Sequence, residues 1–168
     1  MHLVSKIYFP RIIIPVSKII VTLIDFVISF ILMVLLMVVF KRLPGWGTAV
    51  VPLLLLATML LSLGLGLWFS ALNVRYRDFR YVVPFIVQLG LYISPVGFSS
   101  TVVPGKWRLL YSLNPMTGII DGFRWALLRG ETRLFVPGFI ISLLLVLVIF
   151  LSGFLYFRKV ERSFADLI

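Results

Sequence analysis

Long apolar segments alternate with short charged segments along the chain. Three stretches, residues 43–74, 81–105 and 134–157, contain no charged residue, and residues 19–40 contain only Asp25. A helix of about 20 apolar residues is long enough to cross the ~30 Å hydrocarbon core of a bilayer. The pattern therefore predicts four transmembrane helices, over residues 19–40, 48–72, 81–98 and 134–157.

Composition supports the same fold class. Of 168 residues, 61% are hydrophobic and 13% are charged, and the mean hydropathy is +1.14. Soluble globular domains carry roughly 25% charged residues. We therefore expect an all-α integral membrane protein in which residues 1–168 form a single membrane domain.

Residues 103–133 are apolar but interrupted by charges, and they differ from the predicted spans. Pro104-Gly105 and Asn114-Pro115 are helix breaks, which leave two short helices at about 105–113 and 115–129. Each is too short or too charged to span, so we expect two short re-entrant helices on the external side. The residues that characterise this region are Trp107, Tyr111, Asn114, Pro115 and Arg124.

Basic residues orient the four spans. An even number of spans places an amphipathic segment at 1–18, a loop at 73–80 and a tail at 158–168 on one side of the membrane. These segments hold nine of the 16 Lys and Arg residues, densely in the loop and the tail. Basic residues favour the cytoplasmic side, so we expect both termini to be cytoplasmic.

Two features within the spans permit a packing role or a functional one. Asp25 is either a near-interface carboxylate paired with an arginine or a contact for substrate or gating. Small residues recur every four positions in the second span, where they predict a face for close helix packing. The members of this small-residue stripe are Thr58, Ser62, Gly66 and Ser70.

The third span carries an aromatic face interrupted by one amide. Its members, at helical spacing, are Tyr81, Phe85, Gln88 and Tyr92. Aromatic rings stack on the C–H faces of sugars, and their polar tips bind hydroxyl groups. The face is therefore either a path for a glycan or an ordinary packed face with an interhelical Gln hydrogen bond.

Catalytic chemistry is not indicated. The sequence has no cysteine and its single histidine is His2, so it lacks the residues of a thiol nucleophile, a metal cluster or a Ser/His pair. The phosphate-cradling glycine loop is absent too. We expect no enzyme, no metal and no cofactor bound by this chain. The net charge of +10 suits membrane lipids rather than nucleic acid.

Five short motifs follow one another over nearly the whole chain: Tyr8-Phe9-Pro10-Arg11-Ile12-Ile13-Ile14-Pro15, Leu72-Asn73-Val74-Arg75-Tyr76-Arg77-Asp78-Phe79-Arg80, Ser94-Pro95-Val96, Leu113-Asn114-Pro115-Met116 and Gly122-Phe123-Arg124. In order and spacing they resemble the membrane subunits of type-2 ABC exporters, specifically permeases for polysaccharides and polyol phosphates such as O-antigen, capsule and teichoic acid.

The resemblance implies a homodimer in the bacterial inner membrane that exports a lipid-linked glycan. A separate cytosolic ATPase subunit would bind and hydrolyse ATP, and the residues that couple to it would be Arg75, Arg77, Asp78 and Arg80. The aromatic face of the third span would line the path of the glycan.

The sequence departs from the family at its N-terminus. Such permeases usually have two further spans before the point that corresponds to Met1, so the chain looks N-terminally truncated relative to them. Two alternatives stay open: a membrane scaffold or remnant that only binds partner helices, and a type-2 exporter of a small molecule or drug.

Overall fold

The structure is a computed structural model that describes residues 13–41, 45–76, 78–128 and 134–165, with the side chains of 13–16 and 162–165 left out. The described residues form helices, with no strand among them. In chain order the elements are α1 (Ile13–Val39), the 3-10 helix η1 (Trp46–Val50), α2 (Val51–Arg75), α3 (Phe79–Ile93), the 3-10 helix η2 (Ser100–Val102), α4 (Gly105–Tyr111), α5 (Pro115–Leu127) and α6 (Val136–Ala165).

Three of these segments are long and apolar enough to cross a membrane: Ser17–Val39, Trp46–Arg75 and Val136–Glu161. They correspond to the first, second and fourth spans expected from the sequence. The third, α3, has 15 residues, which gives a helix about 22 Å long at 1.5 Å per residue. It ends at Ile93 rather than at residue 98 because Ser94 precedes Pro95, and a residue before proline is driven out of the helical region.

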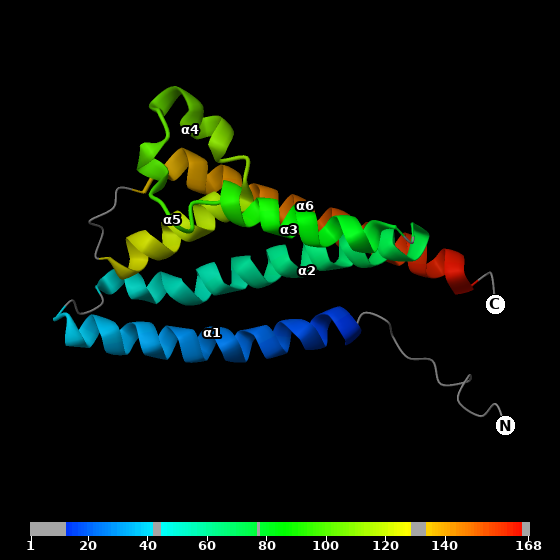
Figure 1. The fold of residues 1–168 in the computed structure, drawn as a ribbon, viewed down its shortest axis with the longest axis horizontal. Coiled ribbons are helices and arrows are strands. Elements are labelled where there is room, and N and C mark those ends of the chain that lie inside the picture. The colour runs from blue at the N-terminus through cyan, green and yellow to red at the C-terminus, as the bar shows by residue number, and fades with distance from the viewer. Residues whose placement is uncertain (1–12, 42–44, 77, 129–133, 166–168) are drawn as a thin grey trace.

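The three long helices lie side by side along the length of the molecule (Figure 1). The start of α1, the turn between α2 and α3 and the end of α6 share one end of this bundle. The helix α4, η1 and the start of α6 lie at the other end.

The α2–α6 interface is built on a seven-residue repeat of small residues. Ala57, Gly64 and Ala71 are all buried. Gly64 faces the backbone of α6, because a Cβ added to it would lie 2.7 Å from Phe150 Cα. A Cβ added to Gly153 of α6 would in turn collide with the Gly64 carbonyl oxygen. Small residues at such positions let two membrane helices approach backbone to backbone.

Polar side chains also stabilise the packing of α6. Trp68 Nε1 donates a hydrogen bond to Ser152 Oγ (3.1 Å), and its ring stacks on Tyr156 with centroids 4.7 Å apart. A second hydrogen bond joins α6 to the end of α4: Ser142, which is fully buried, donates from its hydroxyl to the Ser112 carbonyl (3.1 Å). Buried polar groups in an apolar setting are costly unless bonded, and these hydrogen bonds satisfy them.

The helix α5 packs into the α2–α6 pair toward the end that holds η1 and the start of α6. Ile119 and Ala126 are buried against residues of α2 and α6 in two apolar clusters. Gly122 touches the Leu54 and Phe139 side chains, and Gly47 of η1 lies against the backbone of Ala126. We call these three packed helices the α2–α5–α6 body.

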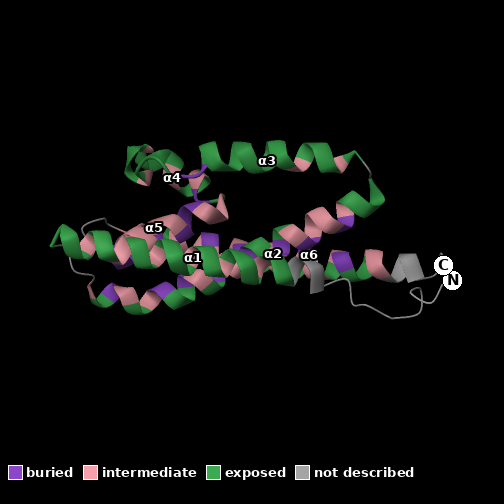
Figure 2. Ribbon diagram, turned by 60° about the horizontal axis from the view of Figure 1, so that its bottom comes forward, coloured by how far each residue is buried: buried purple, intermediate pink, exposed green. Residues whose placement is uncertain are grey.

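The helices α1 and α3 lie outside this body. No described side chain of α1 is buried, and α3 has no buried residue (Figure 2). Both helices are nevertheless apolar, with large side chains such as Ile28, Leu32 and Phe85 exposed. Their surfaces suit lipid or other membrane helices.

Candidate functional site

The charged turn joins α2 to α3. Arg75 closes α2, Asp78 occupies the N-cap position of α3, and Arg80 lies in its first turn. All three are exposed. Arg77, the fourth residue expected to contact an ATPase, lies outside the described residues.

Backbone hydrogen bonds shape this turn. The Tyr76 amide donates to the Leu72 carbonyl (2.7 Å), and the Phe79 amide donates to the Tyr76 carbonyl (3.0 Å). Arg75 lies over the Tyr76 ring, with Cζ 5.6 Å from the centroid, and Arg80 lies over Tyr81 at 5.7 Å. The charges therefore gather at the surface of one end of the bundle, beside aromatic rings that suit a membrane interface.

The aromatic face on α3 is exposed as a unit. Tyr81 is 74% exposed and Tyr92 71%, and Phe85 and Gln88 are exposed between them. The face begins at Tyr81, in the first turn of α3, and runs to Tyr92, in the last turn. Because none of its members packs on the α2–α5–α6 body, all four side chains are available to a ligand or to another helix.

A cluster of polar contacts joins the two short helices to the segment after α3. The Tyr111 hydroxyl donates to the Ile93 carbonyl (2.7 Å), and Asn114 Nδ2 donates to Ser94 Oγ (3.0 Å). Arg124 donates through Nη1 to the Phe98 carbonyl (2.8 Å) and through Nη2 to the Val96 carbonyl (3.1 Å). Sequence reasoning placed these residues in the external region but did not predict these contacts.

The ion pair of Arg124 and the protonation of Tyr111 both favour these hydrogen bonds. Arg124 also pairs with Asp121, with 3.8 Å between Nη1 and Oδ1, so the guanidinium is partly neutralised as well as bonded. Burial is the main cause that raises the pKa of Tyr111 above 10.0. The phenol thus stays protonated, and donates, at neutral pH.

The two short helices begin and end close to the predicted positions. Asn114 caps α5 by accepting a hydrogen bond from the Met116 amide (3.1 Å), and Pro115 takes the first helical position, where its missing N–H costs nothing. The fold of α4 brings Trp107 to the surface, where it is exposed. Trp46 is exposed too and meets Trp125 edge to face, with centroids 5.4 Å apart.

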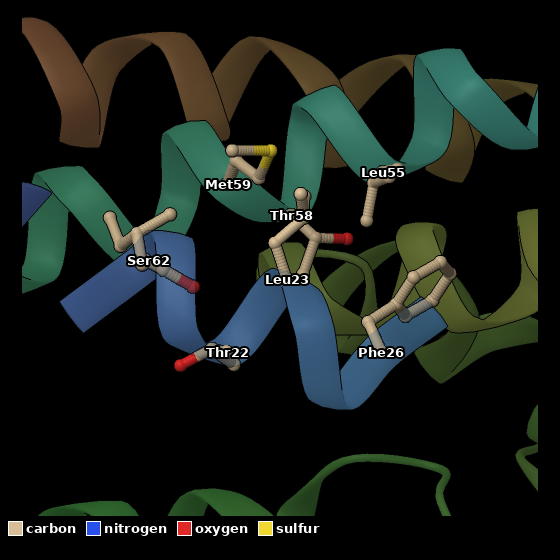
Figure 3. Close-up of a pocket in the computed structure, with 8 residues that line it drawn as sticks. Thr22, Leu23, Phe26, Leu55, Thr58, Met59 and Ser62 are labelled. Carbon is tan, nitrogen blue, oxygen red and sulfur yellow. The ribbon is translucent and has the colours of Figure 1, made fainter. Parts of the chain in front are cut away.

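The small-residue stripe does not form the α2–α6 interface. A Cβ added to Gly66 would meet nothing within 4 Å, whereas Gly64 is in close contact. Thr58 and Ser62 instead line a pocket of about 120 Å³ between α1 and α2 (Figure 3). Thr58 donates back to the Leu54 carbonyl of its own helix (2.9 Å), so it bridges no helices there.

The small residues at the α2–α6 interface recur every seven positions. A search for small residues every four positions therefore does not find them. Ala57, Gly64 and Ala71 are visible in the sequence at that spacing. Seven residues are close to two helical turns, the repeat that keeps one seam facing a neighbouring helix. The small-residue stripe stays a prediction for close packing against another helix.

The remaining polar features are Asp25 and the side chains that could bind a metal. Asp25 is exposed on α1, and among the described residues no ion pair joins it to an arginine. Over the described ranges, no three His, Cys, Asp or Glu side chains come together as metal ligands.

The three long apolar helices among the described residues define an integral membrane protein. The family model described as ABC-2 type transporter matches residues 2–128, and the chain belongs to that family. Among curated proteins, it is similar to two O-antigen export system permease proteins RfbA from Klebsiella pneumoniae, with 23% and 24% identity over 99% of this chain and 64% of each relative. The RfbA permease from Myxococcus xanthus is 29% identical over 73% of this chain and 48% of its own length. The chain thus spans 64% of the Klebsiella relatives that it matches.

Proposed function

We propose that this chain is a permease subunit of an ATP-driven exporter that moves a lipid-linked polysaccharide across the bacterial inner membrane. The observation that carries the proposal is the exposed aromatic face of α3, with Tyr81 and Tyr92 more than two thirds exposed. The names of the relatives, O-antigen export system permease proteins, support the same substrate class.

Four spans and an external pair of helices fit this function. In this proposal α3 crosses the membrane together with the segment that follows it, although the helix alone is only about 22 Å long. The helices α4 and α5 are re-entrant and lie on the external side. Exposed Trp107 and Trp46 support that placement, because tryptophan is enriched where the bilayer meets water.

Energy comes from a partner in this scheme. A cytosolic ATPase subunit binds ATP and docks at the charged turn, where Arg75, Asp78 and Arg80 are exposed and Arg77 lies between them in sequence. Two permease copies form a homodimer, and the α3 aromatic face lines the path between them. The chain itself binds no cofactor and catalyses no reaction.

The path needs aromatic rings rather than hydrogen-bonding groups alone. A lipid-linked glycan must slide without stopping, so each contact has to be weak and replaceable. Stacking on exposed Tyr81, Phe85 and Tyr92 provides such contacts, since aromatic pairs contribute only about 0.5–1.5 kcal/mol each beyond burial. The Gln88 amide adds a donor and an acceptor midway.

Deletion of the gene in its own host tests the proposal. We expect the surface polysaccharide to disappear and lipid-linked polysaccharide to accumulate inside the cell, and re-expression of the intact gene to restore both. Surface glycan is read by gel electrophoresis of cell envelopes, and the intracellular pool by extraction of glycolipids. Unchanged surface glycan in the deletion strain would exclude this function.

A further inference from the structure

The helix α3 is attached to the rest of the described chain near its two ends. At the inner end, Phe79 packs on Phe69 of α2, with ring centroids 6.5 Å apart. At the outer end, Ser94 and Pro95 are buried. Between these points α3 has no buried residue, and Figure 2 shows it standing apart from the α2–α5–α6 body.

The outer attachment is made by side chains, not by apolar packing alone. Three side chains from α4 and α5 donate the hydrogen bonds of this attachment: Tyr111, Asn114 and Arg124. Their four acceptors lie within residues 93–98 and are the carbonyls of Ile93, Val96 and Phe98 and the Ser94 hydroxyl. The α5 side of this attachment cannot shift easily, because α5 is buried between α2 and α6.

We propose that Tyr111, Asn114 and Arg124 form a clamp that pins the outer end of α3 to the α2–α5–α6 body. With the inner end held by the charged turn, α3 becomes a strap that is fixed at both ends and able to bend between them. Pro84 lies in its inner half and removes one N–H from the helical hydrogen-bond ladder, which makes bending easier there.

Arg124 is the central residue of the clamp. Its planar guanidinium presents two N–H donors in a fixed fork, and the two carbonyls it binds are two residues apart in a segment that has no regular secondary structure of its own. A lysine carries a point charge and cannot hold both carbonyls in the same geometry. Asp121, one turn earlier on α5, orients the guanidinium.

The sequence makes the clamp measurable, because it contains no cysteine. Leu91→Cys on α3 and Leu144→Cys on α6 are exposed positions outside the clamp and outside the aromatic face, and both can carry a spin label. The full chain is reconstituted in lipid nanodiscs, and the distance distribution between the labels is measured by pulsed electron spin resonance.

We expect a narrow distribution with the clamp intact. Arg124→Gln should broaden it measurably, because the two charge-assisted hydrogen bonds from the guanidinium to the carbonyls of Val96 and Phe98 are lost. Arg108→Gln is the matched control: it removes an arginine from α4 that lies over the Phe135 ring and takes no part in the clamp through its side chain. That variant should keep the narrow distribution.

Tyr111→Phe keeps the test decisive if Arg124→Gln does not fold, since it removes a single oxygen and retains the ring. It should broaden the distribution less than Arg124→Gln. The proposal is overturned if every clamp variant that folds, including Tyr111→Phe, gives a distance distribution as narrow as that of the labelled protein with the clamp intact. The measurement does not depend on what the protein exports, so the clamp and the proposed function stand or fall separately.

Discussion

Trp68 of α2 and Ser152 of α6 meet in the bundle, where the indole N–H donates a hydrogen bond to the serine hydroxyl over 3.1 Å. Trp68→Phe should remove this bond and keep an aromatic ring against Tyr156, which stacks on Trp68. We expect a loss of about 0.6 kcal/mol in the free energy of unfolding, the average for interhelical hydrogen bonds in membranes. Thermal unfolding in detergent measures it.

A double-mutant cycle is the control for this bond. Ser152→Ala should cost a similar amount, and the double variant should cost less than the sum of the two single variants. Strictly additive losses would mean that the two residues do not interact.

Gly64→Ala should destabilise the bundle. The added Cβ would lie 2.7 Å from Phe150 Cα and 2.8 Å from its amide nitrogen, and neither backbone atom can give way without moving α6. Overpacking of this kind costs about 1–3 kcal/mol. Gly66→Ala, two residues away on the same helix, meets nothing within 4 Å and should be neutral or slightly stabilising. Equal thermal midpoints for the two variants would contradict the assignment of the α2–α6 interface.

Neutralising the charged turn should weaken binding to the ATPase subunit. Arg75→Gln with Arg80→Gln removes two exposed cations from the turn, and we expect roughly 10-fold less ATPase to co-purify, a loss of about 1.4 kcal/mol. Arg158→Gln with Lys159→Gln is the matched control, because it removes two exposed cations from α6 at the same end of the bundle. If both pairs reduce co-purification equally, the turn has no special role and net charge explains the effect.

Loss of the aromatic face should slow export. Tyr81→Leu with Tyr92→Leu keeps α3 apolar but removes two stacking surfaces, and surface glycan should fall about 10-fold at two stacking contacts of roughly 0.5–1.5 kcal/mol each. Val87→Leu changes an exposed residue of α3 outside the aromatic face and should leave export unchanged. Glycan levels are compared at equal amounts of permease in the membrane. If the double variant exports glycan at the wild-type level, the aromatic face does not line the path of the glycan.

Alkaline pH should loosen the clamp through Tyr111. Its pKa is raised in the folded protein, so the stabilisation from its protonated form is complete below the ordinary value of 10.0 and is lost as the pH rises through the folded pKa. Tyr111→Phe cannot ionise and should lack this step. The difference in thermal midpoint between the two proteins, measured from neutral to strongly alkaline pH, should therefore shrink at the alkaline end. A constant difference would show that the hydroxyl makes no contribution that depends on its proton.

The sequence predicted the parts of the fold that depend on local chemistry. Long apolar runs located α1, α2 and α6. Pro104-Gly105 and Asn114-Pro115 located α4 and α5, because helix breakers and caps act on their immediate neighbours. The early end of α3 was also readable from Pro95, since proline restricts the residue before it. The expected bound at residue 98 followed the apolar composition, which continues past Pro95.

Contacts between distant segments were less predictable. The small-residue stripe was chosen by a four-residue period, whereas α2 meets α6 along Ala57, Gly64 and Ala71. Which face a helix buries depends on the partner's position, and an apolar helix that is hydrophobic all round gives no preference. The clamp was invisible for a related reason: Arg124 binds carbonyls 26 and 28 positions earlier, and carbonyl acceptors carry no sequence signature.

The seam between α2 and α6 has a consequence for biosynthesis. Trp68 and Ser152 are 84 positions apart, so at about 5–20 residues per second the ribosome takes roughly 4–17 s to deliver the partner of α2. During that interval the surface of α2 at Gly64, which packs against α6 in the folded protein, is covered by lipid or by a helix of another protein. The α2–α6 seam can therefore form only after α6 is made, and a nascent chain that stops before residue 136 leaves the α2 surface around Gly64 without its packing partner.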